Sequence, residues 1–421
     1  MNLNNLKKEI AKAKKASASL LSIGARERRS VLLKLADMLV KNSQRIIEAN
    51  LTDIRDAKRA GKPESFIERL TLDEEKIFGM SESVRTIADA KDILFETLEE
   101  ARRPNGLHIK KVRFPLGLIA TVYESRPNVT IEAFTIAFKS GNALLLKGGK
   151  EICHTNRVLV ALIHQALKAE RIRTDVAKDL SGLDKKLTLE LMRNSAIDCL
   201  IPRGGQRLVA FVKEHTRVPV IITGASVVHT YVDESANITD AVRIIVNAKT
   251  RRVSICNALD VVLVHKDISS KILRSLAMEL SRRNVEIRAD AKSYRILKQG
   301  GYAHLTRAKK TDFDTEFLDY VLAVKVVGDF EEAMRHIEAH SLGHSEAVVT
   351  RSKEQSEEFF RRIDAACLYV NTSTQFSDGV EFGLGGEVGV STQKLHARGP
   401  FATAELTTYK YLVESNNATR E

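Results

Sequence analysis

One cysteine of the chain, Cys256, lies in a polar and basic segment that could make its thiol reactive. The segment reads Asn247-Ala-Lys-Thr-Arg-Arg-Val-Ser-Ile-Cys256-Asn257-Ala258. Nearby cations lower the pKa of a thiol and so supply the thiolate, which is the nucleophile. A buried structural thiol is the commoner fate of an isolated cysteine. Apolar surroundings favour that structural role for the other three cysteines, Cys153, Cys199 and Cys367. The local sequence alone leaves both roles open for Cys256.

Two glycine pairs follow apolar segments and could bind anions. Lys147-Gly148-Gly149-Lys150 places two cations around a glycine pair, which suits phosphate groups. Arg203-Gly204-Gly205 precedes an expected helix, whose first N–H groups can hold an anion. Both segments could equally be ordinary turns, because the six-residue GxGxxG fingerprint is absent.

The elements that must hold these segments alternate between strand and helix. Residues 1–95 have apolar positions at helical spacing, with a break at Gly61-Lys62-Pro63. Strands are expected at 117–123, 143–147, 198–202, 218–222, 259–265, 320–327, 347–350 and 367–371, and helices at 127–139 and 152–169. Such alternation predicts parallel sheets with right-handed crossovers in two α/β domains. A ligand is expected at the carboxyl ends of the strands, in the crevice between the domains.

Two further segments depart from this alternation. Turn residues at Ala101-Arg-Arg-Pro-Asn-Gly106, between short apolar runs, predict a projecting hairpin over residues 96–114. Residues 371–400 are dense in glycine and polar side chains. A long segment of this kind is more often a functional loop than filler, and it could close over a substrate.

The bulk properties exclude several classes of protein. The chain has 421 residues, 43% of them hydrophobic, and a formal net charge of +12. Its length predicts two or more domains, and no apolar run is long enough to span a membrane. The basic side chains are spread along the chain without a basic, aromatic stripe, which argues against nucleic-acid binding. Four cysteines without a CxxC pair argue against a zinc site and for a reducing, cytoplasmic compartment. Residues 1–21 also resemble a transit peptide, but the helical pattern continues beyond them.

Taken together, these segments resemble the γ-glutamyl phosphate reductases of the aldehyde dehydrogenase superfamily. The likeness covers nearly the whole chain, and the last matching motif is specific to this family. The matching motifs are Tyr123-Glu-Ser-Arg-Pro-Asn-Val129, Lys139-Ser-Gly-Asn-Ala143, Lys147-Gly-Gly-Lys-Glu151, Ile201-Pro-Arg-Gly-Gly205, Asn247-Ala-Lys249, Cys256-Asn257 and Ser391-Thr-Gln-Lys-Leu-His-Ala-Arg-Gly-Pro400.

The resemblance implies an α/β fold like that of aldehyde dehydrogenases, with three parts. A Rossmann-type NADPH-binding domain is expected at residues 1–95 and 115–246, and a catalytic domain at 247–400. Residues 96–114 and 401–421 would form an oligomerisation hairpin and a C-terminal strand, because exposed strands of this kind need a partner. A homo-oligomer, dimer or tetramer, is therefore expected.

The resemblance also implies a reaction, the NADPH-dependent reduction of γ-glutamyl phosphate to glutamate semialdehyde in proline synthesis. Cys256 matches the nucleophile that forms a thioester, which hydride then reduces. Asn128 matches the asparagine that stabilises the oxyanion, although helix capping is an alternative role for it. The kinase that makes glutamyl phosphate is a possible transient partner.

For the cofactor, Lys147 matches the lysine that contacts the adenosine ribose. Related NAD-using enzymes often carry a glutamate three positions later, where this chain has Lys150, and a cation there favours NADPH. Gly204 and Gly205 are expected to bind the cofactor as well. Glu316 resembles, more loosely, the glutamate that holds the nicotinamide ribose.

The substrate's phosphate and carboxylate are expected to meet basic residues of the matched motifs. The candidates are Arg126, Lys249, Arg251, His396 and Arg398, with Arg126 and Arg398 favoured. Each of them could instead be a structural ion-pair partner. No metal is expected.

A missing residue and two departures from the family pattern refine this hypothesis. Hydrolytic relatives carry a glutamate base about 34 residues before the cysteine, whereas residues 218–228 contain no carboxylate. This absence favours a reductase, which must protect its thioester from water. The usual Gly-Xaa-Cys-His run is here Ser226-Val-Val-His229, and the usual proline before Cys256 is missing. The alternatives are another acylating or ordinary aldehyde dehydrogenase, and a non-catalytic or nucleic-acid-binding relative.

Overall fold

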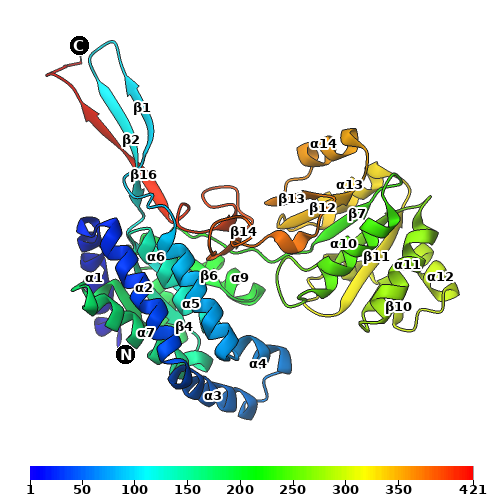
Figure 1. Cartoon of the computed structure of the whole chain (residues 1–421), viewed down its shortest axis with the longest axis horizontal. Coiled ribbons are helices and arrows are strands. Elements are labelled where there is room, and N and C mark those ends of the chain that lie inside the picture. Colours follow the sequence, from blue (N-terminus) through cyan, green and yellow to red (C-terminus); the bar gives the residue numbers. More distant parts are fainter. Residues whose placement is uncertain (421) are drawn as a thin grey trace. The chain divides into compact units, whose positions relative to one another are not determined.

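The computed structural model describes residues 1–420, and the chain divides into two compact units (Figure 1). Unit 1 contains residues 1–223, 383–389 and the chain from Leu395 onward. Unit 2 contains residues 224–382 and 390–394. These units divide between Thr223 and Gly224, whereas the expected boundary at residue 246/247 lies inside helix α10 (Ile238–Thr250). Over residues 1–420, no helix combines the length and apolar character needed to cross a bilayer.

Unit 1 begins with helices and continues with a parallel sheet. The first helices are α1 (Leu3–Ser19), η1 (Leu20–Ser22), α2 (Ala25–Lys41), α3 (Ser43–Arg59), α4 (Glu64–Leu70) and α5 (Glu74–Asp89). The sheet has the order β5-β4-β3-β6, with β3 (Leu118–Tyr123), β4 (Ala143–Gly148), β5 (Ala177–Asp179) and β6 (Cys199–Arg203). Its connections contain α6 (Asn128–Lys139), η2 (Lys150–Ile152), α7 (Cys153–Ala169), η3 (Thr174–Val176) and α8 (Lys185–Met192), and α9 (Gln206–His215) follows β6. Every residue of β3 is buried, as expected for a parallel strand covered on both faces.

A three-stranded antiparallel ribbon projects from the rest of unit 1 (Figure 1). It consists of β1 (Thr97–Arg102), β2 (His108–Pro115) and β16 (Thr407–Glu414), with β2 in the middle. The predicted hairpin is confirmed, and the C-terminal strand pairs with its second strand.

Unit 2 is built on a seven-stranded parallel sheet with the order β10-β9-β11-β8-β7-β12-β13. The strands are β7 (His229–Val232), β8 (Val261–His265), β9 (Glu286–Ala289), β10 (Leu305–Arg307), β11 (Val321–Val327), β12 (Ser345–Val349) and β13 (Cys367–Val370). Alternate residues of β8 enter two separate cores. One core contains Val262 with residues of α10, α11 (Ser269–Ser281) and α12 (Ala291–Gln299). The other contains Leu263 with residues of α13 (Phe330–His340) and α14 (Lys353–Arg362).

The remaining elements are short. They are η4 (Lys310–Asp314), η5 (Thr374–Phe376), β14 (Gly389–Ser391) and β15 (Gly399–Phe401). The strand expected at residues 218–222 is wrong, because only an isolated bridge between Leu200 and Val220 forms there. Pro219 has no N–H to donate to a ladder, which explains the interruption. Six strands that the structure shows, β5, β7, β9, β10, β14 and β15, were not expected.

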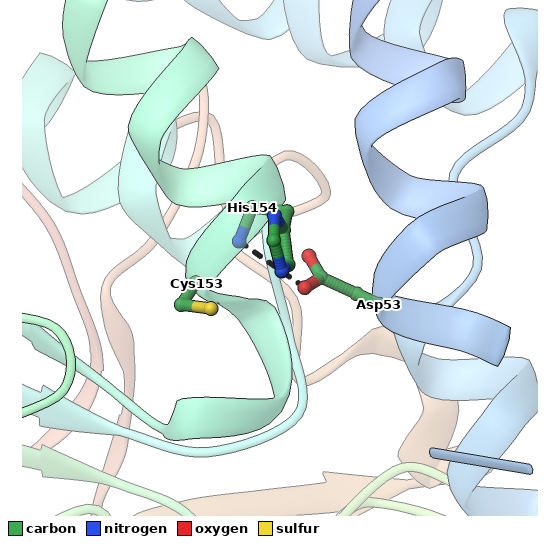
Figure 2. Close-up of side chains that lie close together, drawn as sticks. All are labelled: Asp53, Cys153 and His154. Carbon is green, nitrogen blue, oxygen red and sulfur yellow. Dashed lines mark hydrogen bonds between the residues drawn. The ribbon is translucent and has the colours of Figure 1, made fainter. Parts of the chain in front are cut away.

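The buried carboxylate of Asp53 on α3 holds the start of α7 (Figure 2). It accepts hydrogen bonds from the main-chain N–H of His154 at 3.1 Å, the N–H of Thr155 at 2.8 Å and the Thr155 hydroxyl at 2.6 Å. Helix α7 has no cap from its own preceding residue, so Asp53 takes that role from another helix. Cys153 and the His154 ring lie beside this carboxylate. The cap therefore fixes the helix that follows the Lys147–Lys150 segment.

Candidate active site

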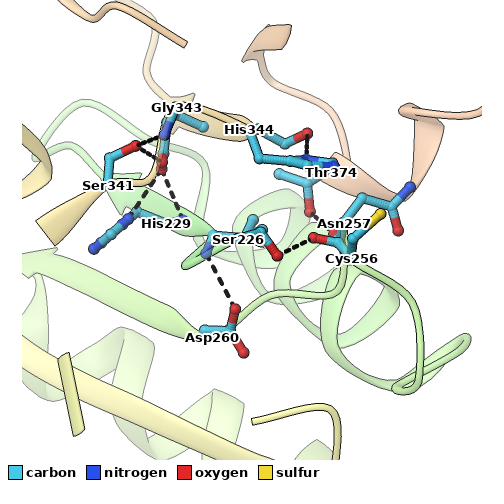
Figure 3. A network of polar contacts seen from close by, with 12 residues as sticks. Ser226, His229, Cys256, Asn257, Asp260, Ser341, Gly343, His344 and Thr374 are labelled. Atoms are coloured by element: carbon cyan, nitrogen blue, oxygen red, sulfur yellow. Dashed lines mark hydrogen bonds and ion pairs between the residues drawn. The ribbon is translucent and has the colours of Figure 1, made fainter. Parts of the chain in front are cut away.

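Cys256 lies in the loop between α10 and β8 and is half-buried. Its neighbour Asn257 is buried, and hydrogen bonds hold both its main chain and its side chain. The Thr374 hydroxyl donates to the main-chain carbonyl of Asn257 at 2.8 Å, and the Asn257 side-chain amide donates to the Ser377 carbonyl at 3.0 Å. Figure 3 shows Thr374 next to this part of the loop. The loop is thus anchored immediately after the thiol.

The segment before Cys256 is anchored by Gln375 of η5. The side-chain amide of Gln375 donates to the main-chain carbonyls of Ala248 at 2.9 Å and Arg252 at 3.2 Å. Gln375 is buried, so these hydrogen bonds are shielded from water. Three polar residues that follow β13 therefore position the cysteine loop, although they lie more than 100 residues further along the chain.

Ser226 makes the third attachment of the cysteine loop, directly at Cys256 (Figure 3). Its hydroxyl lies against the main-chain carbonyl of Cys256 in a short hydrogen bond. The same hydroxyl lies 3.1 Å from Oε1 of Glu316. Burial raises the pKa of Glu316, and the nearby Asp260 carboxylate raises it further, whereas Ser226 and His344 oppose the shift. The structure thus brings the Cys256 carbonyl and the Glu316 carboxyl group within hydrogen-bonding distance of one buried hydroxyl.

Lys249, expected to bind the substrate, is instead buried inside unit 2 with 0% of its surface exposed. Its ammonium donates to the Leu259 carbonyl at 2.9 Å. Burial lowers the pKa of Lys249 to about 8, although the Asp260 carboxylate opposes the shift. An ammonium without exposed surface cannot contact a dissolved phosphate, so we remove Lys249 from the proposed substrate-binding residues. Its role in the structure is to support the chain beside Cys256.

Asp260 is the buried counter-charge of Lys249 and also organises the main chain around the site. Its carboxylate accepts hydrogen bonds from the N–H groups of Val228 at 3.1 Å and Phe317 at 3.0 Å. Burial raises the pKa of Asp260 to about 6, with Lys249 opposing the shift. Asp260 therefore links the start of β7, shown in Figure 3, to the residue that follows Glu316.

A second buried polar pair, His229 and Glu346, joins β7 to β12, and Figure 3 shows His229 near Ser226. Nδ1 of His229 lies 3.0 Å from Oε2 of Glu346, and both side chains have 0% exposure. The same oxygen accepts the main-chain N–H of His229 at 2.8 Å. His229 belongs to the Ser226-Val-Val-His229 run, which differs from the family pattern. Its role in the structure is to join two strands of the sheet of unit 2.

In unit 1, Asn128 is the first residue of α6 and is half-buried. Its side-chain amide donates to Oε1 of Glu132 at 2.7 Å, one turn further along the helix. It does not cap α6, because the cap position is taken by Pro127. The capping alternative for Asn128 is therefore not supported, and its amide lies at the helix start with one donor directed to Glu132.

The loop before Asn128 is set by a carboxylate of the glycine-pair segment. Ser125 has a φ of 53°, in the left-handed region that is unfavourable for a serine. Its N–H donates to Oε1 of Glu151 at 2.9 Å, which stabilises this conformation. Arg126 follows and is half-buried. Glu151 therefore connects the Lys147–Lys150 segment to the loop that carries Arg126 and Asn128.

The Lys147–Lys150 segment lies at the carboxyl end of β4, as predicted. Lys147 is half-buried, and burial lowers its pKa while Glu151 and Glu124 oppose the shift. Lys150 is exposed at the start of η2. A Cβ on Gly148 would come within 2.3 Å of the Asn156 amide, so the strand end requires glycine there. Two cations beside a glycine pair fit the phosphate groups of a nucleotide.

Gly204 and Gly205 are exposed, and Gly205 caps helix α9. The Gly205 N–H already interacts with the Glu124 carboxylate, whose pKa is raised by loss of water. A Cβ on Gly204 would come within 2.6 Å of that carboxylate. This glycine pair therefore binds an anion of the chain itself, as a helix start favours.

The two remaining candidates lie in the C-terminal segment of unit 1. His396 and Arg398 are exposed, and His396 has a φ of 47°. The His396 ring lies 2.6 Å from the Glu405 carbonyl through Nε2. Of the predicted site residues, unit 2 thus holds Cys256, Lys249, Arg251 and Glu316, and unit 1 holds the others. Sequence reasoning missed Glu151, Asp260, Thr374 and Gln375, whose roles depend on contacts between distant segments.

Comparisons with known proteins agree with this architecture. The model of the aldehyde dehydrogenase family matches residues 1–294 and 306–410. A γ-glutamyl phosphate reductase of Carboxydothermus hydrogenoformans is 44% identical over 403 residues, covering 96% of each chain. One from Neisseria meningitidis is 44% identical over 426 residues and covers 100% of each chain.

Solved structures show the same relationship. The crystal structure of γ-glutamyl phosphate reductase from Thermotoga maritima matches with a TM-score of 0.93 and 39% identity, covering 99% of this chain and 100% of that one. The chain therefore belongs to the aldehyde dehydrogenase family and, within it, to the γ-glutamyl phosphate reductases.

Proposed function

We propose that this protein reduces L-glutamyl 5-phosphate to L-glutamate 5-semialdehyde and phosphate, with NADPH as the hydride donor. The observation that carries the proposal is the anchored, half-buried Cys256, in a loop fixed by Ser226, Thr374 and Gln375. Two relatives that are named γ-glutamyl phosphate reductases and are 44% identical over nearly the whole chain support the choice of substrate. The reaction is the second step of proline synthesis.

The chemistry begins with the thiolate of Cys256. It attacks the acyl carbon of the substrate, the carbon–sulfur bond forms, and the carbon–oxygen bond to phosphate breaks, releasing phosphate. NADPH, when bound, supplies the hydride that reduces the thioester. The carbon–sulfur bond then breaks, the thiolate returns and the aldehyde leaves. The side-chain amide of Asn128 and the main-chain N–H of Cys256 would donate to the oxyanion of each tetrahedral intermediate.

For the cofactor we propose Lys147 and Lys150 as the cationic residues of the nucleotide site. Their place at the end of β4, beside a glycine pair without room for side chains, supports this choice. Lys150 would favour the 2′-phosphate of NADPH by charge. Glu316 is proposed to hold the nicotinamide ribose, and the Gly204–Gly205 loop is a weaker contact because Glu124 already uses its N–H.

For the substrate's charged groups we propose Arg126, Arg398 and His396. Glu151 fixes the loop that carries Arg126, and both C-terminal side chains are exposed. We also propose a homo-oligomer, dimer or tetramer, formed through the projecting ribbon, where Tyr409, Tyr411, Leu412 and Val413 are exposed. Sedimentation of the full chain, compared with that of Leu412→Lys, measures this assembly.

A second candidate is a hydrolytic aldehyde dehydrogenase, in which water resolves the thioester. One observation favours it, because the carboxyl group of Glu316 is linked to Cys256 through Ser226 and has a raised pKa, as a general base requires. Its burial behind the main chain of Cys256, and the lack of a carboxylate in residues 218–228, favour the reductase.

The reverse reaction separates the two candidates. NADP⁺ reduction is measured with pyrroline-5-carboxylate, which equilibrates with the semialdehyde, in the presence and absence of inorganic phosphate. We expect NADPH to form only with phosphate and not in Cys256→Ala. Formation without phosphate would establish the hydrolytic reaction instead. No turnover in folded protein under either condition would contradict the proposed substrate.

A further inference from the structure

Ser226 links the two groups on which the proposed reaction depends most in unit 2. Its side chain is 0% exposed. The hydroxyl bonds to the carbonyl of Cys256 and lies 3.1 Å from Oε1 of Glu316 (Figure 3). The main-chain N–H of Ser226 also points to the Glu316 carboxyl group. No water can replace a hydrogen bond at a hydroxyl buried to this degree, so both contacts have to be satisfied by the hydroxyl and its two neighbours alone.

Counting protons shows that the two contacts depend on the state of Glu316. A serine hydroxyl has one proton to donate, and a main-chain carbonyl can only accept. The hydroxyl must therefore donate to Cys256. The contact with Glu316 is then satisfied only if the carboxyl group is protonated and donates to the Ser226 oxygen. The chain of hydrogen bonds runs from Glu316 through Ser226 to Cys256.

Ionisation of Glu316 would break this arrangement. A carboxylate is the stronger acceptor, because a hydrogen bond to a charged oxygen exceeds one to a neutral carbonyl. The Ser226 hydroxyl would turn toward Glu316 and release the carbonyl of Cys256. Burial and the Asp260 carboxylate favour the protonated form of Glu316, and His344 is the facing group that favours ionisation.

The geometry points to Ser226 as a positioning residue that couples the protonation state of Glu316 to the main-chain position of Cys256. This inference deepens the proposed function, since it assumes that the placement of Cys256 matters for catalysis. Thr374 offers a matched control. Its hydroxyl donates to the next carbonyl of the same loop, at Asn257, and within residues 1–420 it makes no hydrogen bond to a carboxyl group.

The test measures the reactivity of Cys256 rather than turnover. The rate of alkylation by iodoacetamide is followed from about pH 5 to 9, a range that covers a raised glutamate and an ordinary thiol. Mass spectrometry of the peptide that contains Cys256 separates its labelling from that of Cys153. In wild type we expect two inflections, one for the thiol and one for Glu316. Across the second, the rate should change roughly fivefold, the factor expected for one neutral hydrogen bond.

The variants assign the second inflection. Ser226→Ala and Glu316→Gln should each show only the thiol inflection. The first variant removes the linking hydroxyl, and in the second glutamine donates to Ser226 at every pH. Ser226→Thr, which keeps a hydroxyl at this position, and Thr374→Ala should both show two inflections. A second inflection that survives in Glu316→Gln, or a wild-type profile with one inflection, would overturn the coupling. If Ser226→Ala does not fold, Glu316→Gln decides alone.

This measurement is independent of the proposed substrate. Two inflections in a protein that does not turn over glutamyl phosphate would support the coupling and contradict the proposed function. One inflection in an enzyme that does turn over glutamyl phosphate would contradict the coupling and support the proposed function.

Discussion

The side-chain amide of Asn128 donates a 2.7 Å hydrogen bond to the carboxylate of Glu132 within helix α6. This pair separates a catalytic role of Asn128 from a structural one. A polar pair four residues apart on a helix stabilises it by only about 0.2–0.5 kcal/mol. Loss of a donor to an oxyanion costs about 2.7–4 kcal/mol of transition-state stabilisation.

We therefore expect Asn128→Ala to lower kcat by roughly a hundredfold or more and to change the free energy of unfolding by less than about 0.5 kcal/mol. Steady-state kinetics and urea unfolding of the same preparation measure both quantities. Glu132→Ala is the matched control, because it removes the same hydrogen bond and leaves the amide. Equal losses of kcat in the two variants would show that Asn128 acts through the helix.

Lys150 should decide between the two nicotinamide cofactors. Replacing the exposed cation with glutamate in Lys150→Glu would repel the 2′-phosphate of NADPH and leave NADH less affected. We expect the ratio of kcat/KM for NADPH to that for NADH to fall by roughly tenfold to a hundredfold, the value of a hydrogen bond to a charged group.

A control for this prediction is Lys168→Glu, which makes the same charge change at the exposed far end of α7. Helix α7 has 17 residues and is therefore about 25 Å long, so Lys168 near its far end cannot directly contact a nucleotide bound at the Lys147–Lys150 segment. An equal shift of the ratio in both variants would attribute it to net charge rather than to the site at β4.

Asp53 should contribute strongly to the stability of unit 1. Asp53→Ala leaves two main-chain N–H groups at the start of α7 without their carboxylate. We expect the free energy of unfolding to fall by about 2–4 kcal/mol, from the lost cap and the buried donors left unsatisfied. Urea unfolding followed by circular dichroism measures the change.

The comparison for Asp53 is Asp56→Ala on the same helix. Asp56 is exposed and makes only a 3.7 Å ion pair with Arg59, so its replacement should cost less than about 1 kcal/mol. Similar losses in the two variants would mean that the buried cap at α7 contributes no more than a surface pair.

Lys249 should make the stability of unit 2 depend on pH in the alkaline range. Its pKa of about 8 in the folded chain lies below the value of about 10.4 expected in the unfolded chain. Between these values the unfolded chain binds the additional proton, so stability rises with pH and the rise is complete above the unfolded value. Below about pH 8 both states are protonated and the effect is constant.

Lys249→Met should lack this increase. The difference in unfolding free energy, wild type minus variant, should grow from pH 8 to pH 10. Lys266→Met, at the exposed end of β8, should follow wild type over the same range. A difference between wild type and Lys249→Met that stays constant with pH would show that Lys249 keeps an ordinary affinity for its proton inside the fold.

Much of this architecture was predictable from local patterns. The strands β3, β4 and β8 consist almost entirely of apolar residues, and parallel strands covered on both faces require that composition. The hairpin at β1 and β2 follows from its turn residues. Cys256, the Lys147–Lys150 segment and Asn128 could be selected because their residue types match a chemistry and a family pattern.

Other features depended on contacts between distant residues. Strand β7 was not predicted because it contains polar residues. His229 is buried there because Glu346, 117 positions later, pairs with it. Lys249 is a cation in a motif that matches the family, so the sequence suggested a phosphate-binding residue. The fold instead places it in the interior near Asp260. The boundary between the units lies between Thr223 and Gly224, well before the Asn247 motif at which the catalytic domain was expected to begin.

The sequence by itself determined the fold class and the family, and it selected Cys256 as the proposed nucleophile, because each depends on residue type, periodicity and order along the chain. Only the tertiary structure decided which polar residues support Cys256. Ser226, Thr374 and Gln375 reach its loop from two other segments. A hydrogen bond requires two groups within about 3 Å, and folding alone determines which distant residues come that close.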